Sequence, residues 1–372
     1  MTAPKLELDG LRKAFGDFTA VDGIDLRVDV GETLALLGPS GCGKSTTLNM
    51  IVGLEQPTAG DIRIDGRSIL SLPPQDRRIG LVFQDYAVFT HMTVRDNLAF
   101  GLMMHDRPKA EIAREVGKVA ELLHLEDVLG DKPKALGSSE LQRVAIGRTL
   151  VTNPALLLLD EPLSNLEAEL RTKMRQQLRE LQAETGQTII YVTHDQIEAL
   201  SLANKIAVMS DGRIRQVGSP DAVYNHPEHE FVATFLGSPP MNLLAGQLAA
   251  DPNDGAEPAL VAGGNSISLK GIPVPSDAGS RALLLGIRPE ALRVVQGDAA
   301  GGRFSGRVTM VELMGADAVL TIEADPWTVK VVNPSKRTTH VGETVTLDFD
   351  GAHMSLFDAD QGDRLGFKEN AA

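Results

Sequence analysis

The chain has 372 residues, of which 36 are Lys or Arg and 50 are Asp or Glu, so its formal net charge is −14. This length predicts two domains, and 42% hydrophobic residues are enough to form a core in each, which excludes a disordered chain. Its apolar runs are far shorter than the roughly 20 residues of a membrane-spanning helix. The acidic balance argues against nucleic acid as the main partner. The single cysteine and the lack of an export signal at the start indicate a cytosolic protein.

From about residue 5 to 236, short apolar runs alternate with longer helical stretches. Runs of four or five apolar residues bounded by turns are typical of strands buried on both faces, and their alternation with helices is typical of parallel sheets. We therefore expect an α/β fold with a mainly parallel sheet. The expected strands are 33–37, 79–83, 156–159, 188–192 and 205–209, and the expected helices are 110–124, 167–185 and 196–203.

The segment 237–242, GSPPMN, interrupts this pattern, because two consecutive prolines continue neither a helix nor a central strand. Beyond it, short and partly alternating stretches are separated by Gly, Asp and Pro, which predicts an all-β second domain, a small barrel. The predicted domains are 1–237 and 238–372. We expect the last five residues, 368–372, to be frayed.

The strongest motif is GPSGCGKS at 38–45, which matches G-x-x-x-x-G-K-[ST] between an apolar strand and a helical segment. Its glycines allow backbone N–H groups to surround a phosphate chain, Lys44 neutralises the β- and γ-phosphates, and the Ser45 hydroxyl can bind Mg²⁺. The helix that follows directs its positive end toward the same phosphates. That helix end also favours a thiolate at Cys42. The simpler interpretation is that Cys42 is a small side chain that fills space in the loop.

Other polar residues follow the remaining strands. Asp160 and Glu161 end the run ALLLLDEP, Gln84 follows 79–83, and His194 follows 188–192. All carboxyl ends of a parallel sheet lie at one edge, so we expect these side chains to converge. Asp160 and Gln84 can hold Mg²⁺, Glu161 can deprotonate a water molecule, and His194 can bond the γ-phosphate. This set predicts phosphoryl transfer to water.

These residues resemble the nucleotide-binding subunit of ATP-binding cassette transporters. GPSGCGKST resembles Walker A, 82–100 the Q-loop region, LLLLDEP Walker B, and 191–199 the H-loop region. The resemblance implies a P-loop NTPase cassette that binds ATP and Mg²⁺, with Ser45, Gln84 and Asp160 around the metal and Glu161, His194 and Gln84 in catalysis. The implied ATP-binding residues are Phe15, which would stack on adenine, Gly38, Pro39, Ser40, Gly41, Cys42, Gly43, Lys44, Ser45 and Thr46. The implied D-loop residues are Ser164, Asn165, Leu166 and Glu167.

The second half resembles importer ATPases for sugars and glycerol phosphates, which carry a regulatory domain similar to an oligonucleotide-binding fold. The segments that carry this likeness are 231–244, 284–292 and 351–365. The resemblance implies uptake of a carbohydrate or polyol through two separate membrane permease subunits, supplied by an extracytoplasmic solute-binding protein. The ATPase would lie on the cytoplasmic face of the inner membrane, as a peripheral protein. The aromatic segment 85–94 would form a groove for a permease helix, or belong to the core.

One segment departs from that family. Its signature loop reads LSGGQ, whereas this chain has LGSSE from Leu136 to Glu140. This loop normally closes over the γ-phosphate bound by the opposite subunit. Gly137 removes a hydroxyl that Ser138 can replace, Ser138 and Ser139 add bulk, and Glu140 brings a carboxylate toward the phosphates.

The D-loop also differs, because Glu167 stands where Asp is usual. Both departures affect the half of the composite site that the chain lends to its partner. We therefore expect a heterodimer with a second, different ATPase. The alternatives are a homodimer with two attenuated sites or another small-solute cargo, a soluble cassette protein that acts outside transport, and a regulatory subunit that does not hydrolyse ATP.

Overall fold

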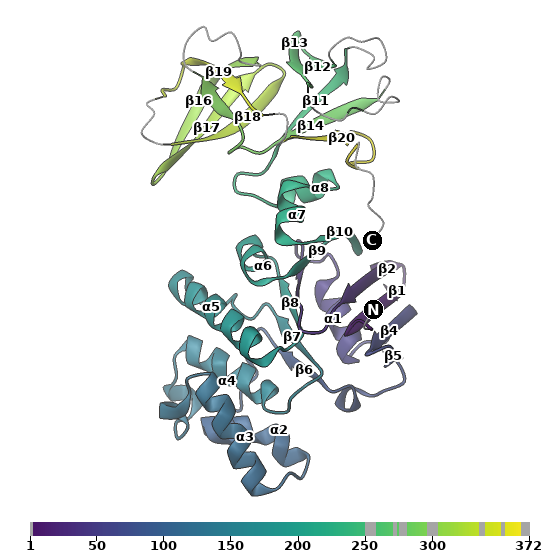
Figure 1. Cartoon of the computed structure of the whole chain (residues 1–372), viewed down its shortest axis with the longest axis vertical. Helices are drawn as coiled ribbons and strands as arrows, with labels where there is room; N and C mark the ends of the chain where they lie inside the picture. The colour runs from purple at the N-terminus through teal and green to yellow at the C-terminus, as the bar shows by residue number, and fades with distance from the viewer. Residues whose placement is uncertain are drawn as a thin grey trace. The chain divides into compact units, whose positions relative to one another are not determined.

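The computed structural model describes residues 3–249, 258–270, 274, 281–295, 304–334, 339–350 and 354–365. The chain divides into two compact units, Met1–Pro220 and Asp221–Ala372. We expected the second domain to begin at residue 238. The second unit begins earlier, at Asp221, so it also contains residues 221–237. The five residues expected to fray, 368–372, lie outside the described residues. Figure 1 shows the order of the elements along the chain.

A six-stranded sheet with the order β10-β9-β3-β8-β7-β6 forms the centre of the first unit. All neighbouring pairs are parallel except β9 and β10, so the predicted mainly parallel sheet is confirmed. The five strands expected from the sequence match within one residue at each end. The bounds are β3 (Thr33–Leu37), β6 (Ile79–Val82), β7 (Leu156–Asp160), β8 (Ile189–Thr193), β9 (Lys205–Ser210) and β10 (Arg213–Gly218).

The first unit also contains a four-stranded antiparallel sheet, which the sequence analysis did not predict. Its order is β2-β1-β4-β5. Leu6, Leu8 and Leu11 on its long first strand are buried, and they pack with Val21 and Ile24 of the second strand in one core cluster. The alternation of apolar and polar residues on these strands fits a sheet with one buried face. The bounds are β1 (Leu6–Phe15), β2 (Phe18–Val28), β4 (Ala59–Ile64) and β5 (Arg67–Ser68).

Six α-helices lie in the described part of the first unit, besides three short 3-10 helices. The three helices expected from the sequence are present as α3, α5 and α6, and α1 follows the glycine-rich loop. Helix α2, which we did not predict, begins with a capping box in which Thr93 Oγ1 accepts the Asp96 N–H at 3.1 Å. The bounds are α1 (Lys44–Val52), α2 (Val94–Met104), α3 (Lys109–Leu122), α4 (Ser138–Leu150), α5 (Ala168–Thr185) and α6 (Gln196–Leu202).

Helices α2, α3 and α4 pack closely because α4 carries Gly147 at their contact. A Cβ at this position would lie 2.7 Å from Leu98, 2.8 Å from Leu123 and 3.1 Å from Val119. These distances are too short for a methyl group, so only glycine permits this approach of the helices. Figure 1 shows the three helices together at the end of the unit that is remote from β1 and β2.

The second unit contains two five-stranded antiparallel sheets, with the orders β13-β12-β11-β14-β20 and β15-β19-β16-β17-β18. The prediction of an all-β domain is therefore confirmed. The bounds in the first sheet are β11 (Asn242–Leu248), β12 (Ala259–Ala262), β13 (Asn265–Ser268), β14 (Ala282–Ile287) and β20 (Met354–Asp358). Those in the second are β15 (Arg293–Val295), β16 (Phe304–Met314), β17 (Asp317–Ala324), β18 (Trp327–Pro334) and β19 (Thr344–Asp348).

A buried arginine holds the two short helices α7 (Pro220–Asn225) and α8 (Glu230–Phe235) against these sheets. Arg288 donates to the carbonyl oxygens of Tyr224 at 2.6 Å and Ala233 at 3.1 Å, and also to that of Leu236. Its guanidinium lies 4.1 Å from the centre of the Tyr224 ring. Removal of this side chain would take its donor groups away from three carbonyl groups, two of them in buried hydrogen bonds. These bonds explain why the segment before residue 238 belongs to the second unit.

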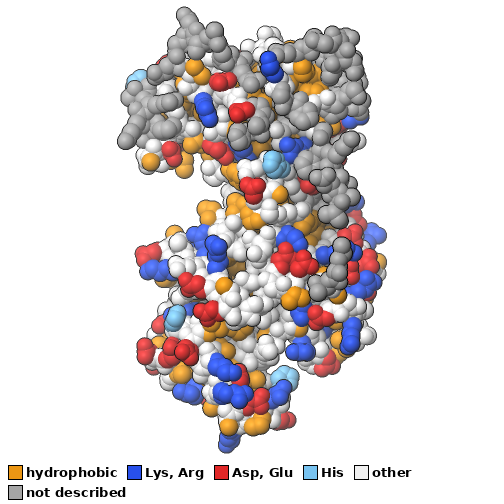
Figure 2. Space-filling model, viewed as in Figure 1, with side chains coloured by type: hydrophobic (Ala, Val, Ile, Leu, Met, Phe, Trp, Pro, Cys, Tyr) orange, Lys and Arg blue, Asp and Glu red, His pale blue; other side chains and the backbone are white. Residues whose placement is uncertain are grey.

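Among the described residues, no helix combines the length and the apolar character needed to cross a bilayer. Acidic and basic side chains are interspersed over the face shown in Figure 2.

Candidate functional site

The polar residues singled out from the sequence emerge at one edge of the six-stranded sheet. The register is nearly flush there, so neighbouring strands end at the same level. The pairs at this edge are Leu37 with Thr193, Val192 with Asp160, and Leu159 with Val82. The glycine-rich loop, Gln84, Glu161 and His194 follow these strands directly. The structure thus brings together four segments that are up to 150 residues apart in the chain.

The loop from Gly38 to Gly43 connects β3 to α1 and is shaped by its contact with β2. Gly43 has φ +106°, and a Cβ there would lie 2.5 Å from the carbonyl oxygen of Ala20. Only glycine fits both the dihedral angle and this approach. Ser40, Gly41 and Ser45 are exposed, whereas Cys42, Gly43 and Lys44 are buried and Pro39 and Thr46 are half-buried. The loop therefore offers backbone N–H groups and the Ser45 hydroxyl at the surface, in front of the N-terminus of α1.

Lys44 is folded onto this loop and is only 5% exposed. Its Nζ donates to the carbonyl oxygens of Gly38 at 2.7 Å and Pro39 at 2.9 Å. A buried ammonium held by two neutral carbonyl groups has no counter-charge among these bonds. Its positive charge is therefore available to an anion in the loop, which is the role predicted for a phosphate-binding lysine.

The two acidic residues at the end of β7 differ in their surroundings. Burial raises the pKa of Asp160, the charge of Glu161 raises it further, and Lys44 opposes both effects. Glu161 adopts φ +44° and its N–H donates to the carbonyl oxygen of Val192 at 2.9 Å. Its carboxylate Oε2 lies 3.0 Å from Nδ1 of His194. Because the Glu161 side chain is 22% exposed and that of His194 is 53% exposed, this pair faces a solvent-accessible site.

A side-chain hydrogen bond joins the D-loop segment to the backbone of the Q-loop segment. The Asn165 side-chain amide donates to the carbonyl oxygen of Gln84 at 2.9 Å. Ser164 Oγ donates to the carbonyl oxygen of Glu161 at 2.8 Å. Leu166 is buried, and Glu167 is the N-cap residue of α5 but makes no side-chain capping bond. The exposed Gln84 is thus held in place by the segment that follows Glu161.

Phe15 lies at the tip of the β1–β2 hairpin and is 48% exposed. Lys13 Nζ lies 4.7 Å from the centre of its ring, a cation–π contact, and β2 contacts the glycine-rich loop through Ala20. Its cross-strand partner Phe18 is 63% exposed and was not singled out from the sequence. The two aromatics flank a Gly-Asp turn, and that local pattern could have drawn attention to both.

The LGSSE segment forms the start of α4. Ser138 is its first residue, and Gly137 is its N-cap with extended backbone. The Glu140 carboxylate accepts the N–H of Gly137 at 2.9 Å, so it lies against the positive end of the helix. Gly137 is exposed, and Ser138, Ser139 and Glu140 are half-buried. A carboxylate therefore lies at the helix end that, by the resemblance seen in the sequence, would approach a phosphate.

Cys42 is buried, with its Sγ 3.8 Å from Lys44 Nζ. Burial raises the pKa of this thiol more than the neighbouring ammonium lowers it. Desolvation therefore outweighs the effect of the helix end, which agrees with our preferred interpretation of Cys42 as a small side chain that fills space. Cys42 fills space beneath the loop.

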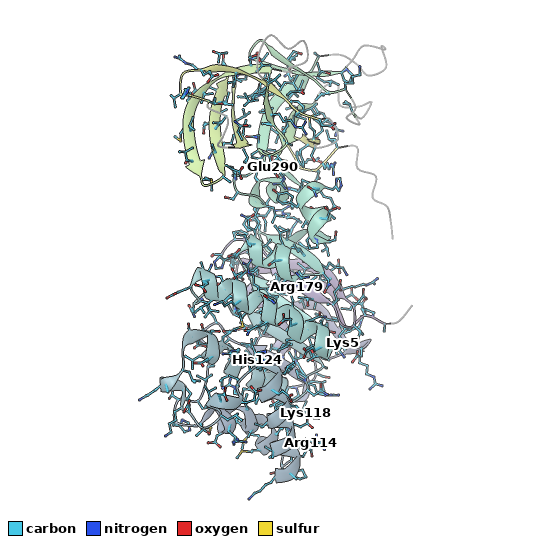
Figure 3. The ribbon with its side chains drawn as sticks, turned by 60° about the vertical axis from the view of Figure 1, so that its left-hand side comes forward. Lys5, Arg114, Lys118, His124, Arg179 and Glu290 are labelled. Atoms are coloured by element: carbon cyan, nitrogen blue, oxygen red, sulfur yellow. The ribbon has the colours of Figure 1, made fainter. Side chains whose placement is uncertain are left out.

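A broad depression between α3 and α5 does not contain these residues. Its volume is about 490 Å³, and Lys118 and His124 line its rim. Figure 3 labels both side chains, with Lys118 on α3. Because it is lined by α3, α4 and α5 rather than by the sheet edge, the depression is separate from the candidate site.

Three known families match successive parts of the chain. The ABC transporter family matches residues 21–164, the MalK OB fold domain matches 237–292, and the TOBE domain matches 285–357. A solved structure of cbiO1 from Clostridium perfringens, part of the ABC transporter complex cbiONQ, has a TM-score of 0.56 and 31% identity. That match covers 59% of this chain and 90% of the other.

Curated relatives are similar over nearly the whole length. The sn-glycerol-3-phosphate import ATP-binding protein UgpC of Cereibacter sphaeroides is 43% identical over 97% of this chain and 99% of its own length. The alpha-glucoside transport ATP-binding protein AglK of Rhizobium meliloti is 42% identical over 95% of this chain and 97% of its own length. The chain belongs to the ABC transporter family. Within it, the protein is an ATP-binding subunit, that is, an ATPase coupled to transport.

Proposed function

We propose that this protein is the ATP-hydrolysing subunit of an importer for a carbohydrate or a polyol, including its phosphate ester. The observation that carries the hydrolytic part is the arrangement of Lys44, Glu161 and His194 at one sheet edge, with the last two side chains 3.0 Å apart. The names of the relatives, one an importer of glycerol 3-phosphate and one a transporter of alpha-glucosides, support the cargo class.

In the proposed site, Lys44 and the backbone N–H groups of residues 40–46 bind the phosphates of ATP. Glu161 positions and deprotonates the attacking water, and His194 bonds the γ-phosphate. Its contact with Glu161 holds the two side chains in a fixed relation, which favours an in-line attack. Phe15 provides a half-exposed ring for stacking with adenine.

The oxygen donors fit Mg²⁺, which prefers one or two protein ligands together with phosphate oxygens and water. No cluster of three His, Cys, Asp or Glu residues occurs in the part of the chain that is described, which suits an ion brought in with the nucleotide rather than a resident metal. Ser45, Asp160 and Gln84 would hold it, and it would neutralise charge on the phosphates. Asp160 is held at the sheet edge by β7, and Ser45 is exposed in the first turn of α1.

The permease subunits would bind beside α2, which would place the protein at the cytoplasmic face of the inner membrane. At the end of this helix Met103 is 49% exposed and Met104 is 62% exposed. The neighbouring Leu102 lines a groove of about 490 Å³ together with His105 and Arg107. By contrast, Tyr86 and Val88 of the segment 85–94 pack against the core. We therefore expect this segment to contribute less than α2 to the contact with the permease. A solute-binding protein outside the membrane would deliver the cargo.

We further propose that the chain pairs with a second, different ATPase. The support is the position of Glu140, whose carboxylate bonds the N–H of Gly137 at the end of α4 that would approach the partner's γ-phosphate. Like charges there oppose closure. The site built from this chain's own residues, facing a normal signature loop, would be the competent one. A homodimer with two attenuated sites is the second candidate.

The composition of the complex tests these proposals. A tagged chain purified from detergent-solubilised native membranes should bring down two permease subunits and one additional ATPase, visible in the intact mass. Two copies of this chain with two permeases would refute the mixed pair but support the importer. A complex without membrane proteins would contradict the importer and favour a soluble cassette protein.

The hydrolytic role has a separate test. Glu161→Gln should abolish turnover and retain bound ATP, because the amide keeps the size of the side chain but is not a base. Unchanged turnover of the complex in this variant would mean that ATP is hydrolysed at another subunit's site, and it would favour a non-hydrolysing regulatory role for this chain.

A further inference from the structure

Arg171, in the first turn of α5, contacts two loops of the candidate site. Its Nε and one terminal nitrogen donate to the carbonyl oxygen of Leu166 at 3.2 and 3.0 Å. Its other terminal nitrogen lies 3.6 Å from Oδ2 of Asp195. One side of the guanidinium therefore holds the D-loop, and the other holds the residue that follows His194.

Asp195 is itself a structural element of the turn that carries His194. Its Oδ1 accepts the N–H groups of Ile197 at 2.8 Å and Glu198 at 3.3 Å, so it caps α6. Its own N–H donates to Thr193 Oγ1 at 2.9 Å. The position of His194 is thus fixed by its two sequence neighbours, one of which is paired with Arg171.

The same turn is anchored from the core side. Thr193 Oγ1 donates to Glu198 Oε2 at 2.8 Å, and the buried Tyr191 hydroxyl donates to the same oxygen at 2.9 Å. Burial raises the pKa of Glu198, the two hydrogen bonds lower it, the charge of Asp195 raises it, and the charge of Arg171 lowers it to a smaller extent. Arg171 therefore also offsets the negative charge that gathers behind His194 on Asp195 and Glu198.

On the D-loop side, Asn165 bonds the Q-loop backbone and Ser164 bonds the backbone of Glu161. Arg171 completes this arrangement at the next residue, Leu166. We propose that Arg171 is a positioning residue that fixes the D-loop relative to the His194 turn, so that a movement of either loop is transmitted to the other. This inference rests on the proposed function, because it assigns His194 and the D-loop to the hydrolytic site.

The geometry requires arginine rather than any positive charge. The planar guanidinium directs two N–H groups at one carbonyl oxygen while a third nitrogen faces the carboxylate, and the ammonium of lysine cannot do both. The Arg171 side chain is 35% exposed and that of Asp195 is 27% exposed, so the ion pair by itself adds little to stability. Its effect should appear in turnover rather than in folding.

The test uses the tagged complex purified from membranes. Arg171→Ala should lower kcat about tenfold and leave ATP affinity within about twofold, because misplacement of catalytic groups slows the chemical step without removing phosphate contacts. Arg171→Lys should be intermediate. Lys173→Ala is the matched control: this residue lies on the same helix, is 68% exposed and pairs with Glu169. It should leave kcat unchanged.

Asp195→Asn separates coupling from stability, because asparagine retains the helix cap and removes the ion pair. Arg171→Ala should then cost clearly less in the Asp195→Asn background than alone. Hydrogen exchange of the full chain gives a second readout: peptides covering 163–168 and 193–198 should both exchange faster in Arg171→Ala. Additive effects on kcat, or wild-type exchange in either loop, would overturn the proposal.

The two proposals fail in different ways. Turnover that survives Glu161→Gln refutes the assignment of the hydrolytic site. Turnover that is lost in Glu161→Gln but normal in Arg171→Ala refutes only the role of Arg171.

Discussion

Nδ1 of His194 lies 3.0 Å from Oε2 of Glu161, although the two residues follow different strands and are 33 positions apart in the chain (194 − 161). Groups that act as a unit in catalysis lose most of their effect when either one is removed. We therefore expect His194→Ala and Glu161→Gln each to reduce kcat by about a hundredfold or more, and the double variant to be scarcely slower. Steady-state and single-turnover ATP hydrolysis would measure this. Multiplicative losses would indicate that the two residues act independently.

We expect the buried carboxylate of Asp160 to reduce the stability of the first unit. Its pKa is raised by burial and by Glu161, so the folded state favours the protonated form more than the unfolded state does. The resulting penalty is absent below the ordinary pKa of 3.8 and complete above the raised value. Asp160→Asn should therefore raise the melting temperature at pH 7, and this gain should shrink as the pH falls toward 3.8.

Thermal unfolding at a series of pH values would check this prediction. Glu169→Gln is a suitable control, because Glu169 is exposed and its pKa is lowered by Lys173. Its pH dependence should have the opposite sign, with any small contribution to stability lost as the pH falls. A gain in Asp160→Asn that does not depend on pH would contradict the prediction.

Glu167 occupies the N-cap position of α5 with φ −65° and ψ 155° but makes no side-chain capping bond. Aspartate is among the best N-cap residues, because its shorter side chain reaches the first free N–H groups. Glu167→Asp should raise the free energy of unfolding by about 1 kcal/mol. Denaturant titration would measure the change, and Glu167→Gln, which has no shorter reach, should give no gain.

Two glycines inside helices should respond in opposite ways to the same substitution. Gly147→Ala should destabilise the protein by about 1–3 kcal/mol, because its Cβ would lie within 3.1 Å of three side chains of the core. Gly117 of α3 is exposed and has open space where a Cβ would be placed. Gly117→Ala should stabilise the protein by about 1 kcal/mol through helix propensity. Chemical unfolding of both variants provides the comparison, and equal signs would refute the packing argument.

Phe15→Ala should weaken ATP binding by about tenfold, because stacking of a base on an aromatic ring contributes about 1–3 kcal/mol. Titration with a fluorescent ATP analogue would measure it. Phe18→Ala is the control, since Phe18 is also exposed at the hairpin tip but lies on the opposite strand. An equal loss in both variants would mean that the adenine contacts the two rings together rather than Phe15 alone.

The sequence was most informative where chemistry and local pattern coincide. The bounds of the buried strands of the parallel sheet were predicted within one residue. A short apolar run such as Thr33–Leu37, bounded by turns, is typical of a strand that is buried on both faces. The antiparallel sheet from β1 to β5 was missed, since its strands carry weaker and bulged alternation, with register shifts along β1. Helix α2 was missed as well: it contains Gly101, which has low helix propensity and whose Cβ would lie 2.6 Å from Thr152.

The amino-acid sequence by itself determined the fold class, the glycine-rich loop and the residues that we propose hydrolyse ATP, because each depends on residue type within a short segment. Only the tertiary structure decided which of these residues meet. The flush register of the sheet brings His194 to Glu161, and α5 carries Arg171 to both Leu166 and Asp195. Such contacts join segments far apart in the chain and depend on the packing of whole elements, which no local pattern encodes.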